Sequence, residues 1–479
     1  MRPAGAGASL RRGLPERRTG PRRSPRRYGG PAGGGFSEWE RVRCFADIPK
    51  ADQVVYRMIF SNGRRQFFTR LILRSAPRKR RRGFLRQRNC QERGFYREGA
   101  GLSKKVPRPP GLNLPQGGCE RKGDPANRRI QGEKEKGWGS RMRTLEELEQ
   151  RMTAPSGRLI EDMKKIDGDM MILGVGGKMG PSLAKLAKKA IDAAGLKKRV
   201  IGVSRFSDKT LREELEACGI ETVACDLLNE EDLKKLPKAK NVIYMAGTKF
   251  GTVGNEHYTW AMNSYLPGRV AEQLPDSRFV VFSTGNVYPL TPVKLGGSTE
   301  ADPPSPIGEY AQSCLGRERI FEHFSKKRGI PVLIFRLNYA IDLRYGVLLE
   351  IASSVYREKP IDLTMGHVNV IWQGDANEYA LRSLLHCKSP ANILNVTGPE
   401  LISVRRVALE FGKRFGKQPV FVNEEADTAL LSNAGKCFQL FGYPSVSLYQ
   451  MIDWVSEWVQ EGGPTLAKPT RFQERGGAF

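Results

Sequence analysis

The sequence predicts an α/β protein built on a doubly wound parallel sheet, and three observations carry this prediction. Short apolar runs typical of buried strands recur from about residue 168: MMILGV, RVIGVS, ETVAC, NVIYMAG, RFVVFST and PVLIFRLN. Segments with helical spacing, such as LAKLAKKAIDAAG and TLREELEACG, lie between most of these runs. A glycine-rich turn follows the first run. Alternating strands and helices favour a parallel sheet covered by helices on both faces.

The glycine-rich turn is the most informative part of the chain. Gly174, Gly177 and Gly180 are spaced by three, after an apolar strand and before a helical segment. The first glycine would permit a tight turn, and the second would let backbone N–H groups approach phosphates. The third would let the helix pack close to the strand, with its positive end toward the phosphates. Glycines also mark ordinary turns, but here the strand and the helix are both present, so we predict a dinucleotide site that includes Lys178 and Met179.

The basic charge is concentrated in the first third of the chain. The 479 residues carry a formal net charge of +28. Residues 1–140 hold 35 Lys and Arg against 11 Asp and Glu, whereas residues 141–479 hold 44 against 40. We therefore treat residues 1–141 as a separate Arg/Gly/Pro-rich extension and expect it to be disordered. Two apolar segments, QVVYRMIF and QFFTRLILRS, interrupt it without a sustained period of 2 or 3.6.

Three interpretations of this extension stay open. A basic arm could bind nucleic acid or an acidic membrane surface, because Lys and Arg displace counterions from phosphates. A transit segment is a second interpretation, since few acidic residues lie near the start. The third, slightly favoured, is a start site placed too far upstream, because Arg, Gly, Pro and Ala have GC-rich codons; Met142 would then open the protein. A nucleic-acid partner is expected only if the arm is translated.

The cysteine and histidine positions argue against a metal site. The eight cysteines form no Cys-x-x-Cys pair, and the four histidines are scattered. We expect no metal, reduced thiols and a cytoplasmic location. No apolar run approaches the roughly 18 residues that a membrane span needs, so no membrane partner is expected.

The alternation of strands and helices loosens beyond Asn338. We expect a nucleotide-binding domain over residues 168–338. Residues 339–479 are expected to form a smaller, mixed C-terminal region, interleaved with the core, that closes over the site.

The ends of the second and third strands hold candidate cofactor residues. Ser204 and Arg205 end the second strand, where no acid is available for the ribose hydroxyls and a guanidinium could bind a 2′-phosphate. This favours NADP weakly over NAD, and a solvated loop arginine is the alternative. Asp226, followed by Leu227, could accept from the adenine amino group or cap a helix.

After the fourth strand, Ala246 and Gly247 would leave room for the cofactor. Together these features resemble an extended short-chain dehydrogenase/reductase of the NAD-dependent epimerase/dehydratase family, from about Met170 to at least Thr397. Asn263 in AMNSYLPG resembles the family's helix asparagine. The segment FSTGNVYP resembles its Ser-Ser/Thr-x-x-Val-Tyr signature, which puts the catalytic hydroxyl on Thr284.

The resemblance extends to two later segments and implies a function. RLNYAIDLRYG resembles the stretch that opens the family's substrate region, and LNVTGPELISV resembles a late family strand and turn. The resemblance implies a Rossmann fold, an NAD(P) cofactor and hydride transfer on a nucleotide sugar or a similar small alcohol or ketone. It further implies a homodimer through helices of the main domain.

The chain departs from the family at the Tyr-x-x-x-Lys motif. Tyr310 stands where the resemblance expects the catalytic tyrosine, but Cys314 occupies the lysine position. A tyrosine with a pKa near 10 is a poor base at pH 7, and an ammonium four residues along a helix would stabilise its phenolate. Cysteine supplies no positive charge. The alternative function is therefore a non-catalytic NAD(P)-binding protein.

Two cations could replace the missing lysine. Arg317 lies seven residues after Tyr310, and Lys249 follows the fourth strand. We expect both to be surface charges. A nucleophilic role for Cys314 is less favoured, because no histidine lies near it in sequence and buried cysteines usually behave as small hydrophobes.

A last segment, MGHVNVIWQGDAN, faces the substrate by resemblance through His367, Asn369, Trp372 and Gln373. Trp372 could stack on a sugar ring, although a core position is the commoner outcome. Asp375 resembles a family helix start, where it is expected to cap rather than catalyse.

Overall fold

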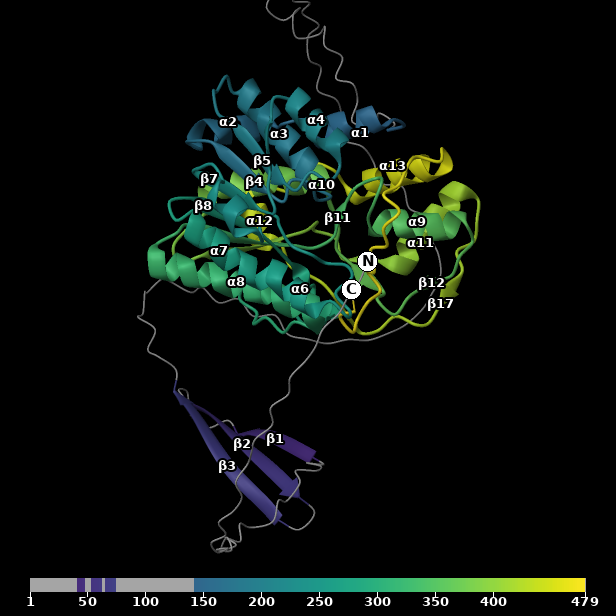
Figure 1. Cartoon of the computed structure of the whole chain (residues 1–479). Helices are drawn as coiled ribbons and strands as arrows, with labels where there is room; N and C mark the ends of the chain where they lie inside the picture. The colour runs from purple at the N-terminus through teal and green to yellow at the C-terminus, as the bar shows by residue number, and fades with distance from the viewer. Residues whose placement is uncertain (1–40, 48–52, 63–64, 75–141, 479) are drawn as a thin grey trace, which may run out of the picture. The chain divides into compact units, whose positions relative to one another are not determined.

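The computed structural model describes residues 41–47, 53–62, 65–74 and 142–478. The chain divides into two compact units, residues 1–118 and 119–479. In Figure 1 one colour scale runs along the chain, from purple at the N-terminus to yellow at the C-terminus.

The first unit contains a three-stranded antiparallel sheet in the order β1-β2-β3. The two apolar segments of the basic extension fall in its second and third strands. The sheet is an exception to the disorder predicted for residues 1–141, whose other residues lie outside the described part of the chain. The strands are β1 (Arg41–Asp47), β2 (Gln53–Asn62) and β3 (Arg65–Arg74).

The second unit is organised around a seven-stranded parallel sheet in the order β15-β10-β8-β7-β4-β5-β6. The first six strands in sequence are the six apolar runs, so the predicted doubly wound sheet is confirmed. The strands are β4 (Met170–Leu173), β5 (Val200–Ser204), β6 (Glu221–Ala224), β7 (Asn241–Tyr244), β8 (Arg278–Thr284), β10 (Val332–Leu337) and β15 (Asn392–Val396).

The strand order reverses beside β4. The chain runs from β4 outward through β5 and β6, and then returns to place β7 on the other side of β4. The register pairs Leu173 with Val203 on one side and with Tyr244 on the other. The loops after β4, β5 and β7 therefore leave the sheet at the same edge. Open α/β sheets bind ligands at such a reversal, outside the carboxyl ends of the strands.

Successive residues of β4 face opposite sides of the sheet, as a strand period of two requires. Met170 and Ile172 join one buried core with α2, α3, α4, α10 and α12, and Met171 and Leu173 join another with α5, α7 and α8. Figure 1 shows these two helical layers. The helices are α2 (Gly157–Lys165), α3 (Gly180–Ala193), α4 (Lys209–Ala217), α5 (Glu230–Lys234), α7 (Leu266–Gln273), α8 (Gly308–Arg328), α10 (Gln373–Arg382) and α12 (Gly435–Phe441).

The C-terminal residues build a third core at the side of the sheet. Helices α9, α11 and α13 pack together there, and α1 contributes Leu148 and Met152. The C-terminal region, predicted to be interleaved with the core, also supplies α10 and the edge strand β15, so it shares one sheet with the preceding residues. These helices are α1 (Leu145–Met152), α9 (Val347–Tyr356), α11 (Val404–Phe415) and α13 (Leu448–Gln460), and α6 (Glu256–Trp260) precedes a π-helical turn, Ala261–Tyr265.

Short strand pairs complete this region. They are β9 (Thr291–Pro292) with β18 (Thr428–Ala429), β11 (Ala340–Ile341) with β14 (Ile371–Trp372), β12 (Ile361–Asp362) with β17 (Phe421–Val422), and β13 (His367–Val368) with β16 (Ile402–Ser403). In the described part of the chain, no helix is both long and apolar enough to cross a membrane.

A buried ion pair connects α8 to strand β10, next to the edge of the sheet. Arg336 on β10 and Glu318 on α8 form two parallel hydrogen bonds of 2.9 and 2.6 Å, and both side chains are excluded from solvent. Glu318 also accepts from the hydroxyl of Ser283, and Arg336 donates to the hydroxyl of Tyr288 at 2.6 Å. Arg336, which begins the segment that resembles the family's substrate region, therefore has a structural partner in the core.

Glu318→Leu should destabilise the protein by about 3–5 kcal/mol, because it leaves the Arg336 charge buried without its carboxylate. Urea unfolding followed by circular dichroism measures this loss. Glu213→Leu on the exposed face of α4 is the matched control and should change the midpoint little. Equal stability of the two variants would show that the ion pair contributes little to the fold.

Candidate functional site

The glycine turn between β4 and α3 is shaped by two close backbone contacts. Gly174 has a φ of +89°, and a Cβ there would lie 2.8 Å from the backbone nitrogen of Ala246. A Cβ on Gly180 would lie 2.2 Å from the carbonyl oxygen of Val175. Gly177 is different, since its Cβ would meet only the Gly174 carbonyl, at 3.3 Å. Gly174 and Gly180 thus allow close backbone packing, whereas Gly177 leaves one side of the turn open.

A cavity of about 830 Å³ lies against this open side of the turn. Gly176 and Gly177 line it, together with residues of α1, α3, α4 and the C-terminal segment. Helix α3 begins here, and no side-chain hydrogen bond caps its N-terminus, so the positive end of the helix dipole lies beside the cavity. The charged lining residues are Glu146, Glu149, Lys178, Lys185, Lys189, Asp208, Glu214, Arg344 and Lys468.

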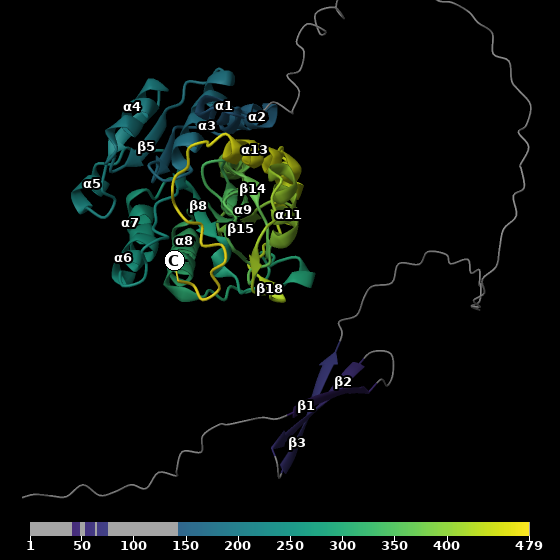
Figure 2. The same cartoon turned by 90° about the vertical axis from the view of Figure 1, so that its right-hand side faces the viewer.

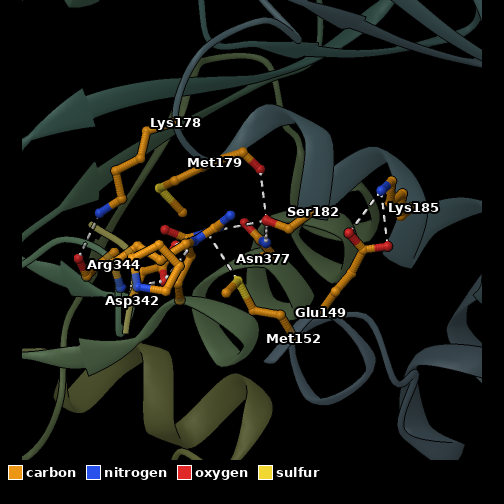
Figure 3. Close-up of polar contacts among 12 residues, drawn as sticks. Glu149, Met152, Lys178, Met179, Ser182, Lys185, Asp342, Arg344 and Asn377 are labelled. Atoms are coloured by element: carbon orange, nitrogen blue, oxygen red, sulfur yellow. Dashed lines mark hydrogen bonds and ion pairs between the residues drawn. The ribbon is translucent and has the colours of Figure 1, made fainter. Parts of the chain in front are cut away.

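Figure 3 shows the polar contacts that surround the turn. Ser182, in the first turn of α3, donates to the Met179 carbonyl at 3.0 Å and accepts from Asn377 at 2.9 Å. Lys185 forms an ion pair with Glu149 of α1 at 2.8 Å. Helix α1 lies before the first strand of the sheet, and the sequence analysis did not assign it to the site.

A second cavity of about 190 Å³ lies at the carboxyl ends of β8 and β10. Lys178 lines both cavities, and the next residue, Met179, lines the second one, so the glycine turn lies beside both spaces. Thr284 at the end of β8 and Tyr310 in the first turn of α8 both line it, as the sequence analysis anticipated. The other lining residues are Lys249, Ser283, Asn286, Leu337, Asn338, Tyr339, Ala340, Tyr345, Gly346, Val347 and Thr470.

Tyr310 sits in an environment that favours its neutral form. Burial raises the pKa of the Tyr310 phenol well above its usual value of 10, and the Cys314 thiol raises it further. The positive charge of Arg317 and a hydrogen bond with Thr284 lower it in part. The Thr284 hydroxyl itself donates to the Asn286 side chain at 3.0 Å and accepts from the Asn286 backbone at 3.1 Å.

Arg317 is not a surface charge, and the sequence expectation is wrong on this point. It is 6% exposed, and its guanidinium donates to the Phe282 carbonyl at 2.7 Å and to the Asn263 side chain at 2.6 Å. Sequence spacing could not reveal this, because the pocket for the guanidinium comes from another loop. A Cβ on Gly247 would lie 2.4 Å from an Arg317 nitrogen, so this glycine makes space for the arginine.

Lys249 is also not a plain surface residue. It is partly buried, lines the second cavity, and lies 5.8 Å from the centre of the Tyr310 ring. Burial lowers the pKa of Lys249 to about 8, an effect that the Cys314 thiol opposes and Arg471 strengthens. The expectation of a surface charge is therefore wrong for this residue as well.

Asn263 has a structural position beneath the loop that follows β7. Its side chain accepts from the Thr248 amide at 3.0 Å and donates to the Thr248 carbonyl at 2.9 Å. It also donates to the Ser313 hydroxyl at 3.0 Å. With the Arg317 contact, these bonds hold the loop against α8. Asn263 does not line the cavity that contains Tyr310.

The remaining cofactor candidates lie at the expected edge of the sheet. Arg205 is exposed after β5, and Ser204 lies directly beneath Gly176, whose Cβ would be 2.5 Å from the serine oxygen. Asp226 is exposed after β6 and accepts from the Leu228 amide at 3.1 Å. The N-cap of α5 is Asn229, so the alternative that Asp226 caps this helix is wrong. Leu227 and Ala246 are buried.

The segment from His367 to Asp375 does not line the cavity beside Tyr310, so its expected place on the substrate side is wrong. Trp372 is a core residue that packs edge-on against Trp454, with ring centres 5.3 Å apart. Gln373 is buried and donates to Ser182 at 3.1 Å. Asp375 accepts from the Ser445 hydroxyl at 2.7 Å and does not cap its own helix, whose N-cap is Trp372.

The C-terminal segment after α13 crosses the site, which the sequence analysis missed. Figure 2 shows this yellow segment running from α13 toward α8. The Leu466 amide donates to the Arg344 carbonyl at 2.9 Å, and the Thr470 amide donates to the Glu350 carboxylate at 2.9 Å. Irregular chain of this kind leaves no periodic signal, so only the fold reveals that Thr470 walls the cavity.

Comparison with known families identifies the domain that carries this geometry. Residues 170–341 match the sequence model of the NAD dependent epimerase/dehydratase family. This part of the chain, which holds the glycine turn, Thr284 and Tyr310, is therefore a domain of that family. No curated protein matches the sequence.

Solved structures that share this architecture include two UDP-sugar epimerases. UDP-glucuronic acid 4-epimerase from Bacillus cereus, in complex with UDP-glucuronic acid and NAD, has a TM-score of 0.52 at 18% identity. UDP-glucose 4-epimerase from Thermotoga maritima, with UDP-glucose, has a TM-score of 0.51 at 16% identity. Each comparison covers 61% of this chain and 99% of the other. At this identity the likeness shows the fold.

Cys314 is fully buried, and burial raises the pKa of its thiol. A higher thiol pKa means less of the reactive thiolate at pH 8. Iodoacetamide at pH 8 should therefore label Cys314 more slowly than the exposed Cys218, by roughly two orders of magnitude. Mass spectrometry of timed samples measures both rates, and unfolded protein provides the control in which they should converge. Comparable rates in the folded protein would restore a nucleophilic role for Cys314.

Proposed function

We propose that this protein is an NAD(P)-dependent enzyme that moves a hydride to or from an alcohol carbon of a nucleotide sugar or a similar small alcohol or ketone. One observation carries the proposal. Thr284 and Tyr310 line a cavity that shares Lys178 with the cavity at an open glycine turn, where the strand order of a parallel sheet reverses. Cofactor site and proton-transfer residues therefore share one cleft.

The glycine turn fits a dinucleotide pyrophosphate. Gly177 has no side chain to fill the space beside the turn, and the positive end of the α3 dipole lies there and would favour an anion. Arg205, which is exposed directly after β5, would bind the 2′-phosphate of NADP, whereas Asp208 of the same loop lines the cavity and would instead suit the ribose hydroxyls of NAD. NAD is the alternative cofactor, and it is the one in the B. cereus epimerase complex.

Tyr310 would transfer the proton of the reacting hydroxyl, and Thr284 would orient that hydroxyl. A bound nicotinamide would supply the hydride acceptor or donor. Tyr310 would remove or return the hydroxyl proton at its phenol oxygen, and Thr284, already hydrogen-bonded to Tyr310, would orient the substrate oxygen. The small cavity would keep these groups in a fixed geometry and limit access of water.

Arg317 would replace the cation that Cys314 does not provide. Arg317 carries a permanent charge whose effect is to lower the pKa of Tyr310. Lys249 lies 5.8 Å from the centre of the Tyr310 ring. One observation favours a second candidate function. The pKa of Tyr310 is raised despite the charge of Arg317, so the phenol stays neutral. A neutral phenol would be no disadvantage in a non-catalytic NAD(P)-binding protein.

Gly177→Val should weaken binding of NAD(H) and NADP(H) at least about tenfold, because its side chain would fill the space beside the turn. The fold should tolerate the change, since a Cβ at this position meets only one atom, at 3.3 Å. Isothermal titration calorimetry measures the affinities. Gly157→Ala, in open surroundings on α2, is the control and should bind like wild type. Equal binding by both variants would remove the proposed cofactor site.

Tyr310→Phe should reduce turnover by about 10²–10⁴-fold while cofactor affinity stays within a few-fold of wild type. UDP-glucose and UDP-glucuronic acid with NAD⁺ or NADP⁺ are the first substrates to test, by product chromatography. Tyr443→Phe, at an exposed tyrosine, is the control. Wild-type turnover that survives Tyr310→Phe would contradict the assigned role. Turnover that arises only in Cys314→Lys would support the non-catalytic alternative.

A further inference from the structure

The cavity beside Tyr310 has an unbalanced charge. Among the described residues that line it, Lys178 and Lys249 carry a charge, and no Asp or Glu is among them. The two lysines come from the loops after β4 and β7, which are neighbouring strands of the sheet. They therefore approach the cavity from the two sides of the strand reversal.

The side chain of Lys178 extends from the glycine turn toward the residues that follow β10. Its amino group donates to the Ala340 carbonyl at 3.0 Å and lies 4.1 Å from the centre of the Tyr345 ring. Figure 3 shows its side chain directed toward the segment that holds Asp342 and Arg344. The Asp342 carboxylate is engaged by Arg344 at 2.8 Å, so it offsets the lysine charge only in part.

Burial destabilises the charged forms of Lys178 and Lys249, and a bound anion would offset this effect. Burial lowers the pKa of Lys178 to about 7, Asp342 opposes this shift, and the charges of Lys249 and Arg344 add to it. Around Lys249, the neighbouring groups that act on its charge are the Cys314 thiol and Arg471. A bound carboxylate or phosphate would pair with both lysines and favour their charged forms.

The size of the cavity limits what this anion can be. Its volume of about 190 Å³ is below the roughly 300–1,000 Å³ of pockets that hold drug-sized ligands. Thr470 of the C-terminal segment forms part of its wall, and that segment is tied to Glu350. A group that binds to both lysines in this cavity would therefore be small, and it would lie in the same cavity as Tyr310.

We propose that the substrate carries a carboxylate or phosphate near its reacting hydroxyl, and that Lys178 and Lys249 bind this group. The inference rests on the proposed function and deepens it, because it places an acidic group at the reacting end of the substrate. Lys178 and Lys249 are then specificity-determining residues of the cavity that holds Tyr310. Neutral alcohols of the same size would lack the charge that pairs with them.

Isothermal titration calorimetry of the NAD⁺-saturated full-length protein tests this inference with three probes. Malonate represents a carboxylate, inorganic phosphate represents a phosphate group, and malonamide is the neutral match for malonate. We expect malonate or phosphate to bind at least tenfold more tightly than malonamide, and the tighter anion identifies the acidic group. Equal binding of malonate and malonamide, or no anion binding, would overturn the inference.

Variants assign the binding to the two lysines. Lys178→Met and Lys249→Met should each weaken anion binding at least tenfold, and Lys249→Arg should retain most of it. Lys413→Met, at a lysine whose side chain is 73% exposed on α11, is the control and should leave anion binding unchanged. Anion binding that survives both methionine variants would also overturn the inference. NAD⁺ affinity is measured in the same samples, so loss of the proposed cofactor site is distinguished from loss of the anion site.

Discussion

The close approach between the glycine turn and the end of β7 is the contact on which the site depends. At Gly174 the turn leaves no room for a side chain against the backbone of Ala246. This contact sets the turn at the point where the strand order reverses, with α3 starting just beyond it. Because β8 pairs with β7, the same arrangement carries Thr284 and the start of α8 to the same edge. The same backbone contact therefore positions both the proposed cofactor turn and the proposed catalytic residues.

The charges around Tyr310 differ from the family pattern because Cys314 occupies the lysine position. The buried Cys314 adds no charge, and the nearest fixed cation, Arg317, is held by a carbonyl and by Asn263 rather than by a carboxylate. A guanidinium bound in this way keeps its charge available to act on Tyr310. The ion pair between Glu318 and Arg336 is the opposite case, since each charge there is satisfied by the other. The consecutive α8 residues Arg317 and Glu318 therefore differ, since the charge of Arg317 has no carboxylate bound to it and that of Glu318 is paired with Arg336.

The fold could be predicted from the sequence because it depends on local patterns. Six apolar runs and a strand–turn–helix glycine pattern were sufficient for the parallel sheet. Thr284 and Tyr310, expected in the site by resemblance, line one cavity, and their roles stay predictions. Residues whose role depends on distant partners were harder to predict. The burial of Arg317 requires Gly247 and Asn263, which lie about 50 or more residues away in sequence, and no periodic pattern links them.

Similar limits explain the other errors. His367, Asn369 and Trp372 were expected near the substrate, but the fold places them within the C-terminal core and its contacts. The aromatic and amide character of this segment fits a buried interface as well as a sugar site, and sequence alone does not separate the two. Helix α1 and the C-terminal segment contribute to the cavities through packing, for which their own sequences carry no marker.

The most direct test of the account is a crystal structure of the protein soaked with NADP⁺ or NAD⁺. The account predicts that the pyrophosphate lies against the backbone between Gly177 and the start of α3, with the nicotinamide directed into the cavity lined by Thr284 and Tyr310. A cofactor bound elsewhere, or a nicotinamide directed away from Tyr310, would contradict it.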